Sequence, residues 1–421
     1  MAFDLILRRG LLRGREQEGP LDLGVVGTRI ALIAPRIEAE GRELDAGGQM
    51  VAPTFIDPHV HLDKALIAET VRDNASGTLT EAIEIIWERK RHYQVAEIVE
   101  RATRVVEWAV GHGTTVIRTH VDVDSIGGLV PLEAILALRK QVADLVDLQV
   151  VAFPQEGILQ DPGTERLLEQ AMEMGADVVG GMPYNERSPE ASRRHIELCF
   201  ELARRFDADL DMHVDETDDP GARTLAMLAD ATIANGWEGR VTAGHTCALA
   251  AYPDPYAAKV IGLVQRAGIH MVTNPATNLM LQGRYDRQPI RRGITRVKEL
   301  LAAGVNVSFG QDCLKDTFYP TFGQADMLEV GLITAHAAQL SMPREVEVLF
   351  DMATRNAAKM LGVADYGLEV GCRASFNLLA CSSVQEAFRT RPERVVVRDG
   401  RVVAESRRQS TLHRQEGPHP T

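Results

Sequence analysis

The chain has 421 residues, of which 45% are hydrophobic and 25% are charged, proportions typical of a soluble globular protein with a large core. Its formal net charge of −13 argues against nucleic acid or an anionic membrane as a partner, because binders of either need clustered Lys and Arg, and no apolar run is long enough to span a bilayer. The five cysteines are scattered and the charged N-terminal segment lacks the apolar stretch of a secretory signal, so we expect a cytoplasmic protein with reduced thiols.

Between residues 51 and 361, short β-branched runs alternate with amphipathic helical stretches. One long helical region is expected over 80–109 and a final one over 324–361. The predicted strands are 51–61, 115–124, 148–155, 176–183, 208–216, 240–245, 268–275 and 305–312. Eight strands that are each followed by helix are typical of a parallel (β/α)8 TIM barrel. The glycine fingerprints of the nucleotide-binding folds do not occur in the sequence.

The two ends of the chain have a different pattern from the middle. Residues 1–52 and 366–410 both consist of short alternating strands, and Asp399-Gly400 between two Val/Arg runs is typical of a tight hairpin. We expect the two ends to form one small discontinuous β-sandwich domain beside a catalytic barrel over 53–365. The polar residues 411–421 are expected to be a tail.

Polar side chains of the kinds that bind metals fall at the ends of several predicted strands. In a TIM barrel, the carboxyl ends of the strands meet at one rim and carry the chemistry. The residues at these ends are His59 and His61 on strand one, His213 with Glu216 on strand five, His245 on strand six and Asp312 on strand eight.

Each of these residues alone has an ordinary alternative, such as a buried imidazole or, for Asp312, a helix N-cap. Together they favour a site for a divalent ion that accepts nitrogen and oxygen ligands, Zn²⁺ or Fe²⁺. Because strand four ends without a lysine that could bridge two ions, one metal ion is the simpler interpretation. His120 lies inside strand two and is interpreted as structural.

Several segments of the barrel region resemble a known family. The segments are FIDPHVHLDKAL, RTHVDVDS, VAFPQEGIL, GADVVGGMP, HVDETDD, TAGHTCA, NPATNLMLQGRYDRQPIRRGITRVKELL and GQDC followed by FYPTFG. They are similar to bacterial cytosine deaminases, which are members of the amidohydrolase superfamily, over roughly residues 50–365. The resemblance implies a barrel deaminase with one iron or zinc ion, a small nucleobase-like substrate and a homo-oligomeric assembly.

The resemblance also implies roles for individual residues. It assigns metal ligation to His59, His61, His213 and Asp312. It makes Glu216 the proton shuttle, His245 the residue that orients the attacking hydroxide and Gln155 the reader of the ring amide edge. Leu79 and Phe318 match positions that sandwich the pyrimidine ring.

These roles agree with elementary chemistry. A bound divalent metal lowers the pKa of water from 15.7 to about 7 and so provides hydroxide at neutral pH. Asp312 can accept a proton as this hydroxide attacks the amidine carbon, Glu216 can then protonate the ring nitrogen, and the exocyclic amine leaves as ammonia. Gln155 offers an N–H donor and a C=O acceptor side by side.

The sequence departs from the cytosine deaminase pattern beside the expected substrate. Cys313 stands where those enzymes tend to carry a second Asp, Gln311 replaces a His, Phe318 replaces a Trp, and strand four ends in MPYNE. A smaller neutral thiol leaves room at the substrate, so we hypothesise turnover of a C5-substituted cytosine such as 5-methylcytosine. Isocytosine or creatinine is an alternative substrate.

Two other functions remain open at this point. The loss of the second Asp also fits an aminotriazine amidohydrolase of the N-isopropylammelide type. A non-catalytic metal-binding barrel is disfavoured because the acid Glu216 is retained next to the expected ligand His213.

Overall fold

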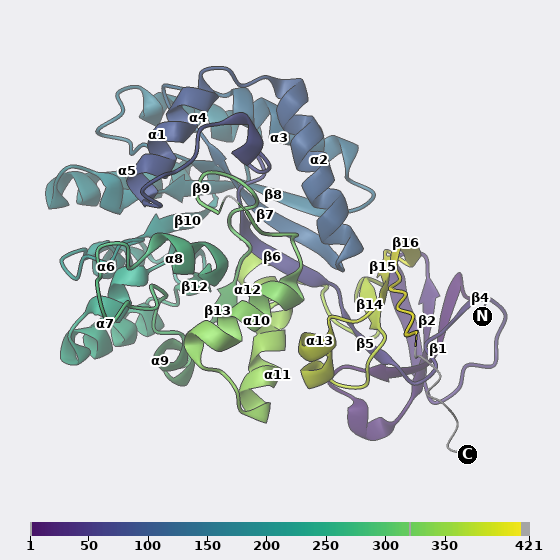
Figure 1. Ribbon diagram of the computed structural model, residues 1–421. Coiled ribbons are helices and arrows are strands. Elements are labelled where there is room, and N and C mark those ends of the chain that lie inside the picture. The colour runs from purple at the N-terminus through teal and green to yellow at the C-terminus, as the bar shows by residue number, and fades with distance from the viewer. Residues whose placement is uncertain (1, 320, 414–421) are drawn as a thin grey trace, which may run out of the picture.

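The computed structural model describes residues 2–319 and 321–413, so most of the predicted tail, 414–421, lies outside the described residues. It contains a barrel of strands surrounded by helices and, at one side of the barrel, a smaller group of strands built from the two ends of the chain (Figure 1). Among the described residues, no helix is long and apolar enough to cross a membrane.

The barrel is an eight-stranded parallel sheet whose order follows the sequence. Its strands are β6 (Phe55–Val60), β7 (Thr114–Asp122), β8 (Asp147–Phe153), β9 (Val178–Gly181), β10 (Asp209–Val214), β11 (Val241–His245), β12 (His270–Thr273) and β13 (Val307–Phe309). A parallel bridge between Val60 and Asp312 joins the first strand to the segment after the last one. This bridge closes the sheet at its carboxyl rim, and the predicted TIM barrel is confirmed.

Helices cover the outside of this sheet, as Figure 1 shows. They are α1 (Leu79–Lys90), α2 (Val95–Gly111), α3 (Val130–Gln141), α4 (Thr164–Met174), α5 (Pro189–Phe206), α6 (Thr224–Asn235), α7 (Asp254–Arg266), α8 (Pro275–Leu281), α9 (Val297–Ala302), α10 (Met327–Ala338), α11 (Pro343–Met352) and α12 (Arg355–Leu361). The helical region expected over 80–109 is therefore two helices, and the one expected over 324–361 is three. The sequence reasoning did not anticipate α8, a short helix that directly follows β12.

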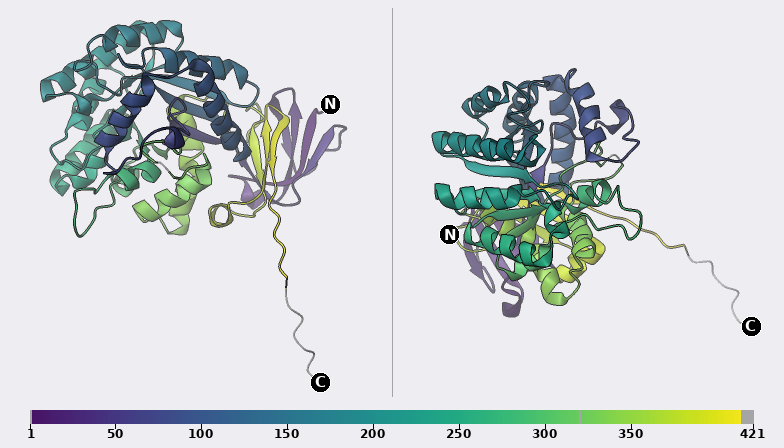
Figure 2. Two further views of the ribbon diagram at one scale, coloured as in Figure 1. Left: turned by 45° about the horizontal axis from the view of Figure 1, so that its top comes forward. Right: turned by 90° about the vertical axis from the view of Figure 1, so that its left-hand side faces the viewer.

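The second sheet combines strands from both ends of the chain, which lie side by side in both views of Figure 2. Its strands are β1 (Leu5–Leu12), β2 (Leu21–Val26), β3 (Arg29–Ala34), β4 (Arg42–Asp45), β5 (Met50–Pro53), β14 (Phe376–Leu379), β15 (Arg394–Arg398) and β16 (Arg401–Ser406). Between β14 and β15 lies α13 (Val384–Thr390), a helix that the sequence reasoning did not anticipate.

Two local features shape the second sheet. Strand β1 bends at Arg9, which has a φ of 55°, so that its first half pairs with β4 and its last two residues pair with β5. Asp399 and Gly400 both have positive φ, 50° and 76°, as a two-residue turn between β15 and β16 requires. The boundaries at residues 52 and 366 stay a prediction.

A small apolar cluster covers the carboxyl rim of the barrel, apart from the main core between strands and helices. It brings together side chains from the segment after β6, from α1, from α8 and from the segment after β13, including Ile83, Cys313 and Phe318. Because burial of such side chains excludes water, the polar residues at the strand ends lie in a shielded environment.

Candidate metal-binding and acid–base site

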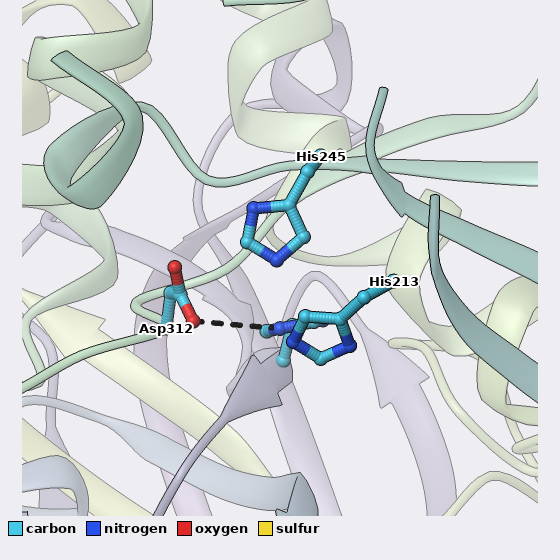
Figure 3. A group of neighbouring side chains, drawn as sticks. His213, His245 and Asp312 are labelled. Carbon is cyan, nitrogen blue, oxygen red and sulfur yellow. Dashed lines mark ion pairs between the residues drawn. The ribbon is translucent and has the colours of Figure 1, made fainter. Parts of the chain in front are cut away.

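Four of the predicted residues meet at the rim, and we call His59, His61, His213 and Asp312 the rim cluster. His61 Nε2 lies 3.1 Å from His213 Nε2, while Asp312 Oδ1 lies 3.4 Å from His61 Nε2 and 3.5 Å from His59 Nε2. All four side chains are at most 5% exposed. Figure 3 shows the His213 ring, the neighbouring His245 ring and the Asp312 carboxylate gathered around one point.

The geometry of the rim cluster fits a divalent metal ion. Two ligands at about 2.1 Å from a tetrahedral ion lie about 3.4 Å apart, close to these three separations. Among the described residues, ligand atoms of His59, His213, His245 and Asp312 all lie within 4.8 Å of one another, so His245 also belongs to the group that could hold the ion. Within the described part of the chain, both ring nitrogens of His59, Nδ1 of His213 and Oδ2 of Asp312 are buried without a hydrogen-bond partner. Buried polar atoms normally have partners, so their lack of one indicates that a further group belongs among them.

The charge states of the rim cluster also suit metal ligation. Burial lowers the pKa of His61 to about 4, and the charge of Lys64 acts in the same direction. Burial likewise holds the pKa of His59 and His213 well below the usual value, so these imidazoles are neutral. Burial opposes the charge on Asp312, but the surrounding histidines outweigh it and hold the pKa of Asp312 well below its usual value. Neutral imidazoles and an ionised carboxylate are the forms that bind metals.

Two of the predicted residues are in a strained backbone conformation. His245 and Asp312 have φ values of 67° and 64°, in the left-handed region that residues other than glycine rarely adopt. Each such residue costs on the order of 1–3 kcal/mol, and such residues concentrate at functional sites. The strain therefore supports a functional role for both.

Glu216 lies next to His245 at the edge of the rim. Its Oε1 is 3.0 Å from His245 Nδ1 and accepts a hydrogen bond of 2.9 Å from Asn278 Nδ2. Although burial lowers the pKa of His245, the carboxylates of Glu216 and Asp312 raise it to about 9. Glu216 is thus held through Oε1 beside a protonated imidazole, and its Oε2 accepts a longer hydrogen bond of 3.5 Å from the Tyr184 hydroxyl.

Two asparagines at this site were missed by the sequence reasoning. Asn274 Nδ2 lies 3.1 Å from His245 Nε2, and Asn278 Nδ2 contacts both His245 and Glu216. They are separated by one helical turn, at the start of α8. The signal was the segment NPATN directly after a strand, which places two amides at the rim.

The predicted substrate-binding residues line one inner cavity. Gln155, Leu79, Cys313 and Phe318 share its wall with His61, His213, Glu216, His245 and Asp312. The cavity shares Leu79, Ile83, Met182 and Glu216 with a larger outer hollow. The structure therefore brings together every predicted site residue, except that His59 lies outside the cavity lining and beside the ring of His120.

Cys313 lies on the cavity wall between the carboxylate of Asp312 and a group of apolar side chains. Cys313 is 3% exposed and packs in the same cluster as Phe318, with Leu79 against it. Burial raises the pKa of the Cys313 thiol well above its usual value, which keeps the thiol protonated and suits a packing role. Phe318 is held by its backbone N–H, which donates to Asp316 Oδ1 at 2.9 Å.

Gln155 differs from the expectation in one respect. Its Oε1 accepts a hydrogen bond of 2.6 Å from the Lys64 ammonium, so the amide does not present a free donor and a free acceptor side by side. Sequence reasoning overlooked Lys64, which belongs to a set of buried charges that we call the lysine network. The network consists of Lys64, Lys90, Asp122, Asp124 and Glu156.

His120, interpreted from the sequence as structural, lies directly against the rim cluster. Its ring centroid is 4.0 Å from that of His59, and its Nε2 is 3.2 Å from Asp211 Oδ1. Asp211 also pairs with Arg118 at 2.9 Å. Ligand atoms of His59, His120 and Asp211 lie within 4.8 Å of one another and form a second group that could hold a metal ion, although a guanidinium so close to the carboxylate disfavours a cation there.

Comparison with known proteins identifies the family of this chain. The model of the Amidohydrolase family matches residues 42–404. The chain belongs to this family. N-isopropylammelide isopropyl amidohydrolase of Pseudomonas sp. (strain ADP) is 34% identical over 95% of this chain and 97% of that protein. The pterin deaminase of Rhizobium rhizogenes (strain K84 / ATCC BAA-868) is 34% identical over 96% of this chain and 89% of that protein.

Two solved structures are also similar to this chain over almost its whole length. The 5-methylcytosine deaminase from Klebsiella pneumoniae liganded with 5-fluorocytosine superimposes with a TM-score of 0.92 at 35% identity, covering 97% of this chain and 99% of that one. N-isopropylammelide isopropylaminohydrolase from Burkholderia multivorans ATCC 17616 gives a TM-score of 0.83 at 30% identity, covering 95% and 98%. This amidohydrolase is therefore a hydrolase that acts on carbon–nitrogen bonds, and its resemblance to cytosine deaminase-like enzymes is confirmed.

Proposed function

We propose that this amidohydrolase is a metal-dependent deaminase that releases ammonia from a C5-substituted cytosine such as 5-methylcytosine. The observation that carries the substrate choice is Cys313, which follows Asp312 on the cavity wall and packs among apolar side chains. A methyl group gains about 0.8 kcal/mol when it is buried against such a surface. The 35% identity to a 5-methylcytosine deaminase over almost the whole chain supports the same choice.

The rim cluster would hold one divalent ion, zinc or iron(II), because its nitrogen and oxygen atoms approach one another at ligand separations. Several further polar atoms of the same four side chains are buried without a hydrogen-bond partner among the described residues. When bound, such an ion makes water acidic enough to act as a nucleophile at neutral pH. Asp312 is ionised and buried beside the cavity, so its carboxylate can accept a proton from that water. His245 lines the same cavity, and its Nδ1 lies 3.0 Å from Glu216 Oε1, so its raised pKa keeps a positive charge beside that carboxylate.

Glu216 moves the proton that releases ammonia. Asn278 and His245 contact its Oε1, and the Tyr184 hydroxyl donates to its Oε2 at 3.5 Å. The carboxylate would take one proton from the attacking water and deliver it to the ring nitrogen next to the amidine carbon. It would then pass the second proton of that water, held meanwhile by Asp312, to the departing amine. Leu79 and Phe318 enclose the planar ring from the cavity wall, and the apolar cluster around them excludes water from the reacting atoms. A well-placed acid or base of this kind accelerates a reaction by about 10²–10⁴-fold.

An aminotriazine substrate of the N-isopropylammelide type is the second candidate, because a relative with that printed activity is 34% identical over nearly the whole chain. A pterin is a third candidate, because a relative with that printed activity is 34% identical over 96% of this chain. Isocytosine and creatinine are cyclic amidines too, so they belong in the same comparison.

An ammonia-release screen of the zinc- and iron-loaded protein tests the proposal. The compounds are 5-methylcytosine, cytosine, isocytosine, creatinine, pterin and N-isopropylammelide. For N-isopropylammelide, the release of isopropylamine is measured instead of ammonia. We expect the highest kcat/KM for 5-methylcytosine. In Cys313→Asp the ratio of kcat/KM values should shift in favour of cytosine, and Cys313→Ser is the matched neutral control. Better turnover of cytosine together with an unchanged ratio in Cys313→Asp would refute the assignment.

A further inference from the structure

Lys64 is buried against the residue that faces the substrate. It follows β6 three residues after His61, and its side chain is 1% exposed. The Nζ atom donates one hydrogen bond of 2.6 Å to Asp122 Oδ1 and another of 2.6 Å to Gln155 Oε1. Burial opposes the charge on Lys64, but Asp122 and Asp63 outweigh it and raise the pKa of the ammonium. The ammonium therefore remains charged beside Gln155.

This contact fixes the orientation of the Gln155 amide. An ammonium has only donors, so the carbonyl oxygen of the amide has to face it and the NH₂ group has to point away. Gln155 Nε2 is buried and has no hydrogen-bond partner among residues 2–319 and 321–413. Because Gln155 lines the inner cavity, its unpartnered NH₂ group is the donor available to a bound ring.

The hydrogen bond from Lys64 also makes the NH₂ group of Gln155 a stronger donor. A hydrogen bond from a charged group is roughly twice as strong as a neutral one, and it polarises the amide so that its N–H groups become better donors. In a shielded cavity, a donor without an acceptor is costly, so a ligand that brings an acceptor is favoured and one that brings a second donor is penalised.

We propose that Lys64 is a positioning residue that locks the Gln155 amide with its NH₂ group toward the substrate. It thereby restricts substrates to rings that carry an acceptor, such as a carbonyl oxygen, at the edge facing Gln155. This inference rests on the proposed function, since a cytosine-like ring presents its C2 carbonyl oxygen on the edge away from the amino group that is lost. A ring that carries an amino group at C2 in place of the carbonyl oxygen is rejected.

Lys90 provides a matched control for Lys64. It is the other buried ammonium of the lysine network and contacts Asp122, Asp124 and Glu156 within 2.8 Å. Asp122 keeps one ammonium partner whichever lysine is replaced, so Lys64→Met and Lys90→Met disturb the same network. Of these two lysines, Lys64 is the one that donates a hydrogen bond to the Gln155 side chain in the described structure.

The test compares two ligands, 5-methylcytosine and 2,4-diamino-5-methylpyrimidine, which differ in the group at C2. Dissociation constants are measured by calorimetry above the pKa of the diamine, together with KM and kcat for ammonia release. The wild-type protein should prefer the carbonyl ring by about 10- to 100-fold. Lys64→Met should lose most of this preference through KM, since the freed amide can rotate, while Lys90→Met should keep it.

A second variant covers the case in which Lys64→Met does not fold. In Gln155→Glu, one carboxylate oxygen remains paired with Lys64 and the other offers only an acceptor, so the preference should reverse toward the diamine. The proposal is overturned if Lys64→Met keeps the preference, if Lys90→Met loses it equally, or if the wild-type protein shows none. Failure of the proposed function is distinguishable, because it would abolish ammonia release from both rings while the preference in binding remains.

Discussion

The rim cluster and the lysine network are both groups of buried polar side chains at the carboxyl end of the barrel, but they differ in how their atoms are satisfied. In the lysine network, Lys64 and Lys90 reach their carboxylate partners within 2.8 Å. In the rim cluster, several ligand atoms have no hydrogen-bond partner among the described residues. A network whose carboxylates are paired with ammonium groups can act as structure, whereas a cluster with unsatisfied lone pairs needs an additional ion.

The largest effect is expected from His59→Leu, which removes a rim ligand while filling a similar volume. Ammonia release should fall to background and the protein should lose its metal. The free energy of unfolding of the metal-free protein should not fall by more than about 1 kcal/mol, because the imidazole that is removed makes no hydrogen bond in the described structure. Metal analysis measures the loss of the ion, and denaturant unfolding measures the change in stability. A large loss of stability would mean that His59 has a structural role, like the residues of the lysine network.

Glu216→Gln separates acid–base chemistry from metal binding at the rim. The amide keeps the shape of the side chain and its contact with Asn278 but cannot shuttle a proton, so kcat should fall by about 10²–10⁴-fold. The metal content should stay that of the wild-type protein. Steady-state kinetics and metal analysis on the same preparation check both statements, and an unchanged kcat would remove Glu216 from the proposed mechanism.

Lys90→Met should have the opposite profile to His59→Leu. Removal of the ammonium leaves Asp124 and Glu156 buried without their lysine partner, which should lower the free energy of unfolding by about 3–5 kcal/mol. The metal content should not change. Denaturant unfolding measures the loss, and the double variant Lys90→Met with Glu156→Gln should recover part of it.

His270 lies outside both groups, and burial is the largest cause of the shift in its pKa. Burial lowers its pKa to about 4, below the value of about 6.5 expected in the unfolded chain. The stability from its neutral form is thus fully present above about pH 6.5 and is lost as the pH falls toward 4, by up to about 3 kcal/mol. Between pH 7 and pH 4, the free energy of unfolding should decline less in His270→Gln than in the wild-type protein. Parallel curves for the two proteins would argue against a contribution from His270.

Much of the fold and of the rim cluster could be predicted because local sequence determines them. Strand ends in a parallel barrel share one rim, so His59, His61, His213 and Asp312 could be grouped before any coordinates were known. The roles of the individual residues stay predictions.

The features that were missed depend on tertiary contacts. A lysine is usually exposed, and only its pairing with Asp122, 58 residues away in the chain, shows that Lys64 is buried and holds Gln155. Asn278 was missed because α8 has only seven residues and follows β12 without a recognisable cap. The orientation of the Gln155 amide could not be inferred from the motif PQEG alone.

Titration of the metal-free protein with zinc or iron(II) tests the central claim most directly. Bound metal per chain, thermal unfolding and ammonia release from 5-methylcytosine are followed together. We expect one ion per chain, a rise in the unfolding temperature on binding and activity that increases in proportion to occupancy, with all three responses lost in His59→Leu. Full ammonia release by the metal-free protein, or tight metal binding that survives in His59→Leu, would contradict the account.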